Sequence, residues 1–335
     1  LFGPISIAIV ANLKLYSAAA PMDQSPAEQV IASMKLFDLK EPEVLERIGM
    51  EPVDVVVIGN LAYVAADNGL SVVDLSGLYL KEDKDRKGLP IPEEQQGELV
   101  DDDEFERRVL EDFDDEVDDL EATGVVLAAL GLVDPDVDIV EALRALLGGG
   151  VVGFYDPETG ELVVRGASIT PYVRTVIAHE LVHALDDQHF DLDRPELDDA
   201  EDESSFGFSA LVEGNARRIE NAYAGTLSED EQRDAYEEQV ALAGDVDLSV
   251  IPFVLVEQIT APYELGEGFV EAVLADGGQA RLDEAFAEPP TTSEQVVEPE
   301  TYLAGEGAVE VPPPTVDGEV IEEGALGQVL ITQVL

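Results

Sequence analysis

The 335-residue chain contains no cysteine and no tryptophan, and only 18 of its residues are lysine or arginine. The lack of cysteine excludes disulfides and thiolate metal ligands. Because 74 residues are aspartate or glutamate, the phosphate contacts that nucleic-acid binding needs are also excluded. No uncharged apolar run reaches roughly 18 residues, so we expect membrane association only through a leader or anchor outside this chain.

The excess of acidic residues gives a formal net charge of -56, far more than solubility requires. Such a surface repels itself at ordinary ionic strength, but near 1 M salt the Debye length falls to about 3 Å and the repulsion is screened. Disorder is the other interpretation of high acidity. Against it, 45% of the residues are hydrophobic, and apolar residues recur at helical spacing even in the acidic stretch 101–120. We therefore expect a folded protein from a high-salt organism.

Histidine is also scarce, and its three copies lie within eleven residues, at His179, His183 and His189. The first two form an H-E-x-x-H pattern with Glu180 between them. Residues four apart share a helix face, so His179 and His183 can bind one metal ion. Glu180 then accepts a proton from the water that the ion acidifies. The capping residue Thr170, a proline at position 171 and the apolar pattern predict a helix over 171–187.

Two residues compete for the place of the third metal ligand. His189 stands at the offset of the third histidine in H-E-x-x-H-x-x-G-x-x-H, but Asp186 replaces the glycine of the required turn, and no methionine follows the motif. Glu213 belongs to the apolar side of a predicted helix over 204–223. A carboxylate there is costly unless it is paired or bound to metal. We favour Glu213 and keep His189 as the alternative.

Four strings resemble one known group of proteins, and they span 153–166, 179–193, 211–216 and 289–297. The chain resembles zincin metallopeptidases of the gluzincin arrangement, especially little-characterised bacterial and archaeal zinc peptidases. The resemblance implies that His179, His183 and Glu213 bind Zn²⁺, that Glu180 is the general base, and that the substrate is a peptide or protein. One departure is that Glu298 to Tyr302 replaces a segment where the family carries a histidine and a lysine.

The residues leave other functions open. An expected hairpin of 151–155 and 161–165 precedes the metal-binding helix, and an edge strand there would hold an extended peptide by main-chain pairing. A phenol could stabilise the developing negative charge, and the candidates are Tyr172, Tyr223, Tyr263 and Tyr302. A non-catalytic zinc-binding recognition protein of the cell envelope is one alternative function. A metal hydrolase that acts on other substrates is the second.

The expected fold is α+β, zincin-like and mostly helical, with a small sheet beside the active-site helix. The segment 53–75 resembles a single LVIVD-type β-propeller repeat with three short strands. Further helices are expected at 122–131, 136–147, 228–243, 250–261, 265–276 and 278–287. The predicted organisation is a leader-like stretch 1–24 that favours the envelope or secretion, a helix and β segment 25–80, a linker 81–100, the peptidase domain 101–305, and a Pro-rich, truncated tail 306–335.

Overall fold

The computed structural model describes four short segments before residue 75, each of them a strand, and most of the chain from residue 97 onward. The described residues are 6–9, 52–58, 61–66, 69–74, 97–111, 113–198, 200, 202–244, 251–309, 312 and 324–334. The predicted helix after position 25 and most of the predicted linker lie outside these residues. The described part is mostly helical with two small sheets, so the α+β class is confirmed.

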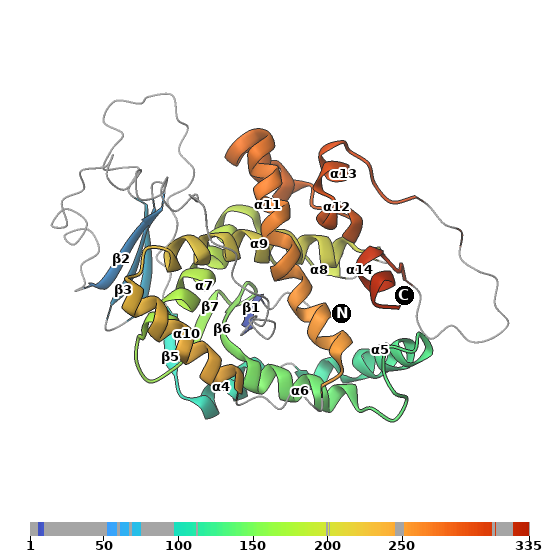
Figure 1. Cartoon of the computed structure of the whole chain (residues 1–335), viewed down its shortest axis with the longest axis horizontal. Coiled ribbons are helices and arrows are strands. Elements are labelled where there is room, and N and C mark those ends of the chain that lie inside the picture. Colours follow the sequence, from blue (N-terminus) through green and yellow to red (C-terminus); the bar gives the residue numbers. More distant parts are fainter. Residues whose placement is uncertain are drawn as a thin grey trace.

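Helices make up the body of the molecule (Figure 1). In chain order they are α4 (Asp102–Val109), the 3-10 helix η1 (Phe113–Glu116), α5 (Val117–Ala129), α6 (Ile139–Gly150), α7 (Pro171–Phe190), α8 (Pro195–Asp198), α9 (Ser204–Ala224), α10 (Glu229–Gly244), α11 (Phe253–Ala287), α12 (Ser293–Val297), α13 (Pro299–Leu303) and α14 (Gln328–Val334). No helix in the described ranges is long and apolar enough to cross a bilayer.

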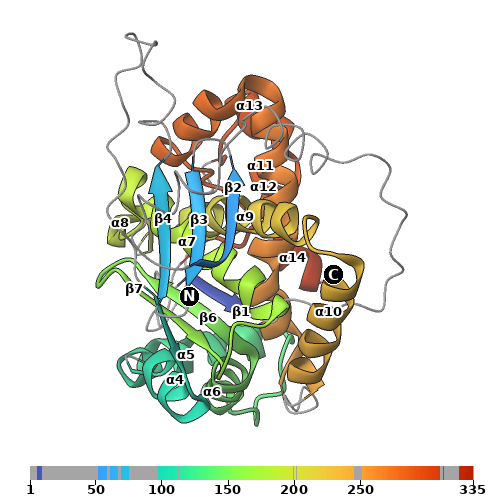
Figure 2. The same cartoon turned by 90° about the vertical axis from the view of Figure 1, so that its left-hand side faces the viewer.

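The strands form two separate sheets. They are β1 (Ser6–Ile9), β2 (Pro52–Ile58), β3 (Leu61–Ala66), β4 (Gly69–Asp74), β5 (Gly97–Val100), β6 (Val151–Asp156) and β7 (Glu161–Arg165). The larger sheet has the order β1-β6-β7-β5, in which only β5 and β7 run parallel. The smaller sheet is the antiparallel meander β2-β3-β4, which Figure 2 shows in front of α7.

The larger sheet is covered on both faces. Val163 on β7 belongs to the apolar cluster that α4, α5, α6 and the start of α11 build. Its neighbours Leu162 and Val164 belong instead to a cluster with Val173 and Val176 of α7. Successive strand residues point to opposite faces, so three consecutive buried residues require cover on each face. The sheet therefore separates α7, the helix that carries the H-E-x-x-H pattern, from α4, α5 and α6.

Helix α7 is the central helix of the described body. The Thr170 hydroxyl caps its start by accepting from the Val173 N–H at 3.1 Å, as the sequence predicts. Nearly all its side chains from Tyr172 to Asp186 are buried, because the sheet, α9 and α10 surround it. It continues three residues beyond the predicted end and stops at Asp191, which has a left-handed φ of 61°. The predicted helix boundary was therefore too early.

A single arginine joins the ends of two helices. Arg194 donates hydrogen bonds to the carbonyls of Phe190 and Asp191, at the end of α7, and of Phe286, at the end of α11. Its guanidinium also lies 4.9 Å from the centre of the Phe208 ring. The last carbonyls of a helix lack intrahelical partners, and a positive charge complements the negative end of the helix dipole. Arg194 thus satisfies both helix ends at once.

Three other expectations differ from the structure. The two helices expected at 250–261 and 265–276 are one continuous segment of α11 through Pro262, and non-helical backbone occurs only at Gly278. The acidic stretch 101–120 is divided into α4, η1 and the start of α5, although Phe105 and Leu120 are buried as expected. The last four residues of the predicted linker form β5.

Candidate metal centre

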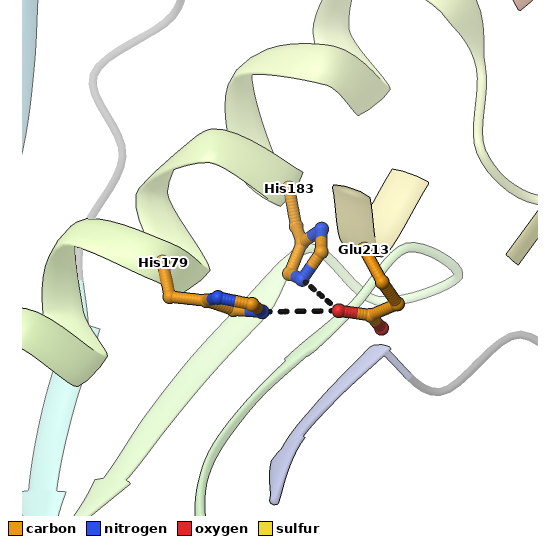
Figure 3. A group of neighbouring side chains, drawn as sticks. All are labelled: His179, His183 and Glu213. Atoms are coloured by element: carbon orange, nitrogen blue, oxygen red, sulfur yellow. Dashed lines mark hydrogen bonds and ion pairs between the residues drawn. The ribbon is translucent and has the colours of Figure 1, made fainter. Parts of the chain in front are cut away.

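Two histidines on α7 face one carboxylate on α9 (Figure 3). His179 and His183 stand one helical turn apart, with ring centres 4.7 Å from each other. The Nε2 atoms of His179 and His183 lie 3.0 Å and 3.3 Å from Oε2 of Glu213. All three side chains are buried, and their donor atoms lie within 4.8 Å of one another. The structure therefore brings together the three ligands that the resemblance implies.

This donor set fits a metal ion. Two imidazole nitrogens and one carboxylate oxygen are one of the sets of three protein ligands that bind catalytic zinc and leave its fourth position open. Nothing in the geometry distinguishes one divalent ion from another. The described part of the chain thus contains a buried group that could hold a metal ion.

A second carboxylate lies behind His179. Oε2 of Glu220 is 3.2 Å from Nδ1 of His179, and Arg217 donates to the same oxygen at 3.0 Å. A carboxylate in this place fixes the tautomer and the orientation of a ligating imidazole. Glu220 was not predicted from the sequence, although it follows Glu213 by seven residues, two helical turns along the same face of α9. That spacing was the available signal.

The carboxylates control the charge of His179. Burial lowers the pKa of His179, but Glu213 and Glu220 outweigh it and raise the pKa to about 10. The pKa of His183 is lowered, mainly by burial. Burial likewise opposes ionisation of Glu213 and Glu220. His183 and His179 nevertheless hold the pKa of Glu213 at about 2, and Arg217 and His179 hold the pKa of Glu220 at about 2. The two carboxylates therefore favour the protonated form of His179, and an entering metal ion must displace that proton.

This proton predicts the pH dependence of metal binding. Between pH 7 and 9 the His179 pKa of about 10 keeps the ring protonated, so zinc binding should release about one proton and tighten about tenfold per pH unit. Titration calorimetry of the chelator-stripped protein in two buffers of different ionisation enthalpy measures that number. In Glu220→Gln, the release at pH 9 should fall, because His179 loses one carboxylate. Zinc binding without proton release would contradict the prediction.

Glu180 lies beside the metal group and against the sheet. It is fully buried, on the helical turn that connects the two histidines. A Cβ atom on Gly153 of β6 would stand 3.2 Å from Glu180 Oε1 and 2.6 Å from a methyl group of Val176. The missing side chain at Gly153 is therefore what lets α7 lie close enough to the strand to place Glu180 there.

Of the four candidate tyrosines, the site contains Tyr263. Its ring stacks on His179 with centres 5.9 Å apart, and its hydroxyl is hydrogen-bonded to Glu213. The negative charge of Glu180 also acts on this hydroxyl. Burial, followed by these carboxylates, raises its pKa well above the usual value. The Tyr302 hydroxyl instead donates to the carbonyl of Glu288, and Tyr223 packs in a small apolar cluster. The sequence did not distinguish them, because Tyr263 reaches the site from α11.

His189 is not part of the donor group. Because α7 continues to Phe190, no turn at Asp186 brings His189 back, and its Nδ1 lies 2.9 Å from the carbonyl of Leu185. Gly214, next to the ligand residue Glu213, packs on Gly266 of α11, where an added Cβ would meet a backbone atom at 2.2 Å.

The hairpin does not offer an edge strand. Strand β6 pairs with β1 on one side and β7 on the other, and β7 also pairs with β5. The expectation that a peptide pairs with an edge strand of the hairpin is therefore wrong. The edges of the sheet are the four-residue strands β1 and β5, which the sequence did not reveal.

The segment around 293–303 forms α12 and α13, which a Thr292 capping box and packing against α11 hold in place.

Fold and site together define an α+β protein with a buried two-histidine, one-glutamate group on two adjacent helices. The LVIVD repeat family matches residues 52–78, which include β2, β3 and β4, so the resemblance expected for 53–75 is confirmed. No curated protein and no solved structure matches the chain significantly.

Proposed function

We propose that the protein is a zinc-dependent metallopeptidase that works in molar salt. The observation that carries this proposal is the convergence of His179, His183 and Glu213 within 4.8 Å, with Glu180 buried on the same helix. Two histidines and one glutamate are a known ligand set of catalytic zinc in peptidases. When bound, zinc would polarise a carbonyl group and lower the pKa of water.

The other groups of the site have roles that follow from their positions. Glu180 takes the proton of the attacking water and delivers it to the leaving amine. Glu220 holds the ring of His179 through Nδ1, which leaves Nε2 for the metal. Tyr263, which contacts Glu213 and stacks on His179, is the candidate phenol for stabilising the negative charge that develops on the substrate.

The replacement Glu180→Gln tests the proposal. It keeps the size of the side chain and removes the base, so peptidase turnover should fall by about 10²–10⁴-fold while bound zinc is retained. Cleavage of a diverse peptide library in molar salt, followed by mass spectrometry, measures turnover. Turnover that survives in this variant would exclude Glu180 as the base.

A second candidate function is non-catalytic recognition by a zinc-binding protein. The match of residues 52–78 to the LVIVD repeat favours it, because such repeats build β-propellers, which are binding scaffolds. It predicts bound zinc without cleavage of any library peptide by the wild-type chain. Cleavage that depends on Glu180 would exclude it.

A further inference from the structure

A buried hydrogen bond joins α7 and α9 next to the metal group. Asp186 follows His183 by three residues on α7, and Asn215 follows Glu213 by two residues on α9. The Asn215 side chain donates from Nδ2 to Oδ2 of Asp186 at 2.7 Å. Their exposed fractions are 6% and 5%, so the bond lies in the interior. It therefore crosses between the ligand-bearing helices within one turn of His183 and Glu213.

The bond has a fixed direction. Arg218 donates to Oδ1 of Asn215 at 2.9 Å, so the amide oxygen is occupied and the amide nitrogen must point towards Asp186. Burial raises the pKa of Asp186 to about 7, against the opposing effects of Asn215 and Arg218 and with a further contribution from Asp283 of α11. Replacement of a buried charged pair by apolar side chains of similar volume is often neutral or stabilising in proteins, and the best-attested use of such buried polar contacts is to set register.

The opposite face of α9 is fixed by a different contact. Gly214 lies against Gly266 of α11, so α9 is packed between α11 and α7. Successive helix residues are 100° apart, so Glu213 and Asn215 lie on either side of the line that faces α7. A slide of one residue would move the Glu213 carboxylate by 1.5 Å along the axis and turn it by 100°. The Asp186–Asn215 bond opposes that movement.

We propose that Asp186 is a positioning residue for the metal centre: by holding Asn215 it sets the register of α9, so that Glu213 faces His179 and His183. The proposal rests on the metal role assigned to these three residues, but it requires no turnover and no particular substrate.

Two replacements of Asp186 separate the hydrogen bond from the charge. Asp186→Leu keeps the branched shape of the side chain but removes the acceptor, and we expect about tenfold weaker zinc binding, the lower end of the loss seen when a hydrogen-bond partner of a metal ligand is removed. Asp186→Asn keeps an acceptor oxygen and should bind zinc within about threefold of wild type by the same reasoning. The matched control is Asn221→Ala, which removes the exposed bonds from α9 to Glu267 on α11. This control should leave zinc affinity unchanged.

The measurements are zinc affinity by chelator competition and the visible spectrum of the Co²⁺-substituted protein, which reports ligand geometry. Circular dichroism melting establishes that each variant folds. The Co²⁺ bands should change in Asp186→Leu and stay as in wild type in Asp186→Asn. A merely structural role would lower the melting temperature and leave the affinity and the bands unchanged, which would overturn the proposal.

A polarity swap keeps the test decisive if Asp186→Leu does not fold. Asn215→Asp alone places two carboxylates face to face and should weaken zinc binding. Asp186→Asn combined with Asn215→Asp restores one amide and one carboxylate, and should recover the affinity and the Co²⁺ bands. Failure of the swap to recover either would overturn the proposal. Wild-type zinc binding without peptide cleavage would overturn the proposed peptidase function alone, whereas a wild-type chain that binds no zinc would overturn both.

Discussion

Glu213→Ala is expected to lose bound zinc, whereas His189→Ala is expected to keep it. Oε2 of Glu213 is the atom that both Nε2 atoms of His179 and His183 face, at 3.0 Å and 3.3 Å. Loss of an outer partner weakens metal binding by about 10–100-fold, so loss of one of three direct ligands should weaken it by more than about 100-fold. The measurement is zinc stoichiometry by elemental mass spectrometry, after dialysis against a weak chelator in molar salt.

His189→Ala is the matched control, because it removes an imidazole from the same helix outside the donor group. Zinc that is lost in His189→Ala and kept in Glu213→Ala would make His189 the third ligand and contradict the geometry. Wild type without zinc would leave two histidines on a purely structural helix. Circular dichroism spectra of both variants establish that any metal loss does not come from unfolding.

Gly266→Ala is expected to destabilise the protein by about 2–3 kcal/mol, as overpacking of a tight contact does. A Cβ atom at Gly266 would stand 2.0 Å from the carbonyl oxygen of Ala210 and 3.1 Å from the Cα atom of Gly214. These are backbone atoms, so no side-chain rotation relieves the clash and the helices must separate. Because Glu213 is adjacent to this contact, zinc binding should weaken in the same variant. Urea unfolding of the chelator-stripped protein in molar salt measures the stability.

Gly268→Ala is the control on the same helix. Nothing lies within 4 Å of a Cβ atom at Gly268, so alanine meets no obstacle there. It should stabilise the protein by about 0.5–1 kcal/mol, because glycine in a helix interior has the larger conformational entropy to lose. Equal unfolding midpoints for Gly266→Ala and Gly268→Ala would show that the contact between α9 and α11 is not tight.

Local signals explain most of what the sequence predicted correctly. The Thr170 cap and the hairpin turn each depend on residues a few positions apart, and each occurs as expected. The grouping of Glu213, and not His189, with His179 and His183 also followed from a local argument, namely a carboxylate on an apolar helix face. Such local arguments identify the buried face of a helix and its first residue, but they do not predict its last residue.

The missed features depend on contacts between distant parts of the chain. Pro262 predicts a helix break because it lacks an N–H group, yet it is buried within α11, where tertiary packing outweighs one lost hydrogen bond. Tyr263 joins the site only because α11 crosses α9. Strands β1 and β5 have four residues each, too few for a recognisable pattern, so the edges of the sheet were not predictable.

Arg194 has a consequence for how the protein opens. Its guanidinium donates to carbonyls at the ends of both α7 and α11, so unwinding either helix end removes part of what holds Arg194 in place against the other. Regions that share such bonds open together, as one cooperative unit. Helix α7, which carries the metal motif, is therefore coupled to α11, which packs against α9 next to Glu213. Fraying at the end of one of these helices is expected to accompany fraying at the end of the other.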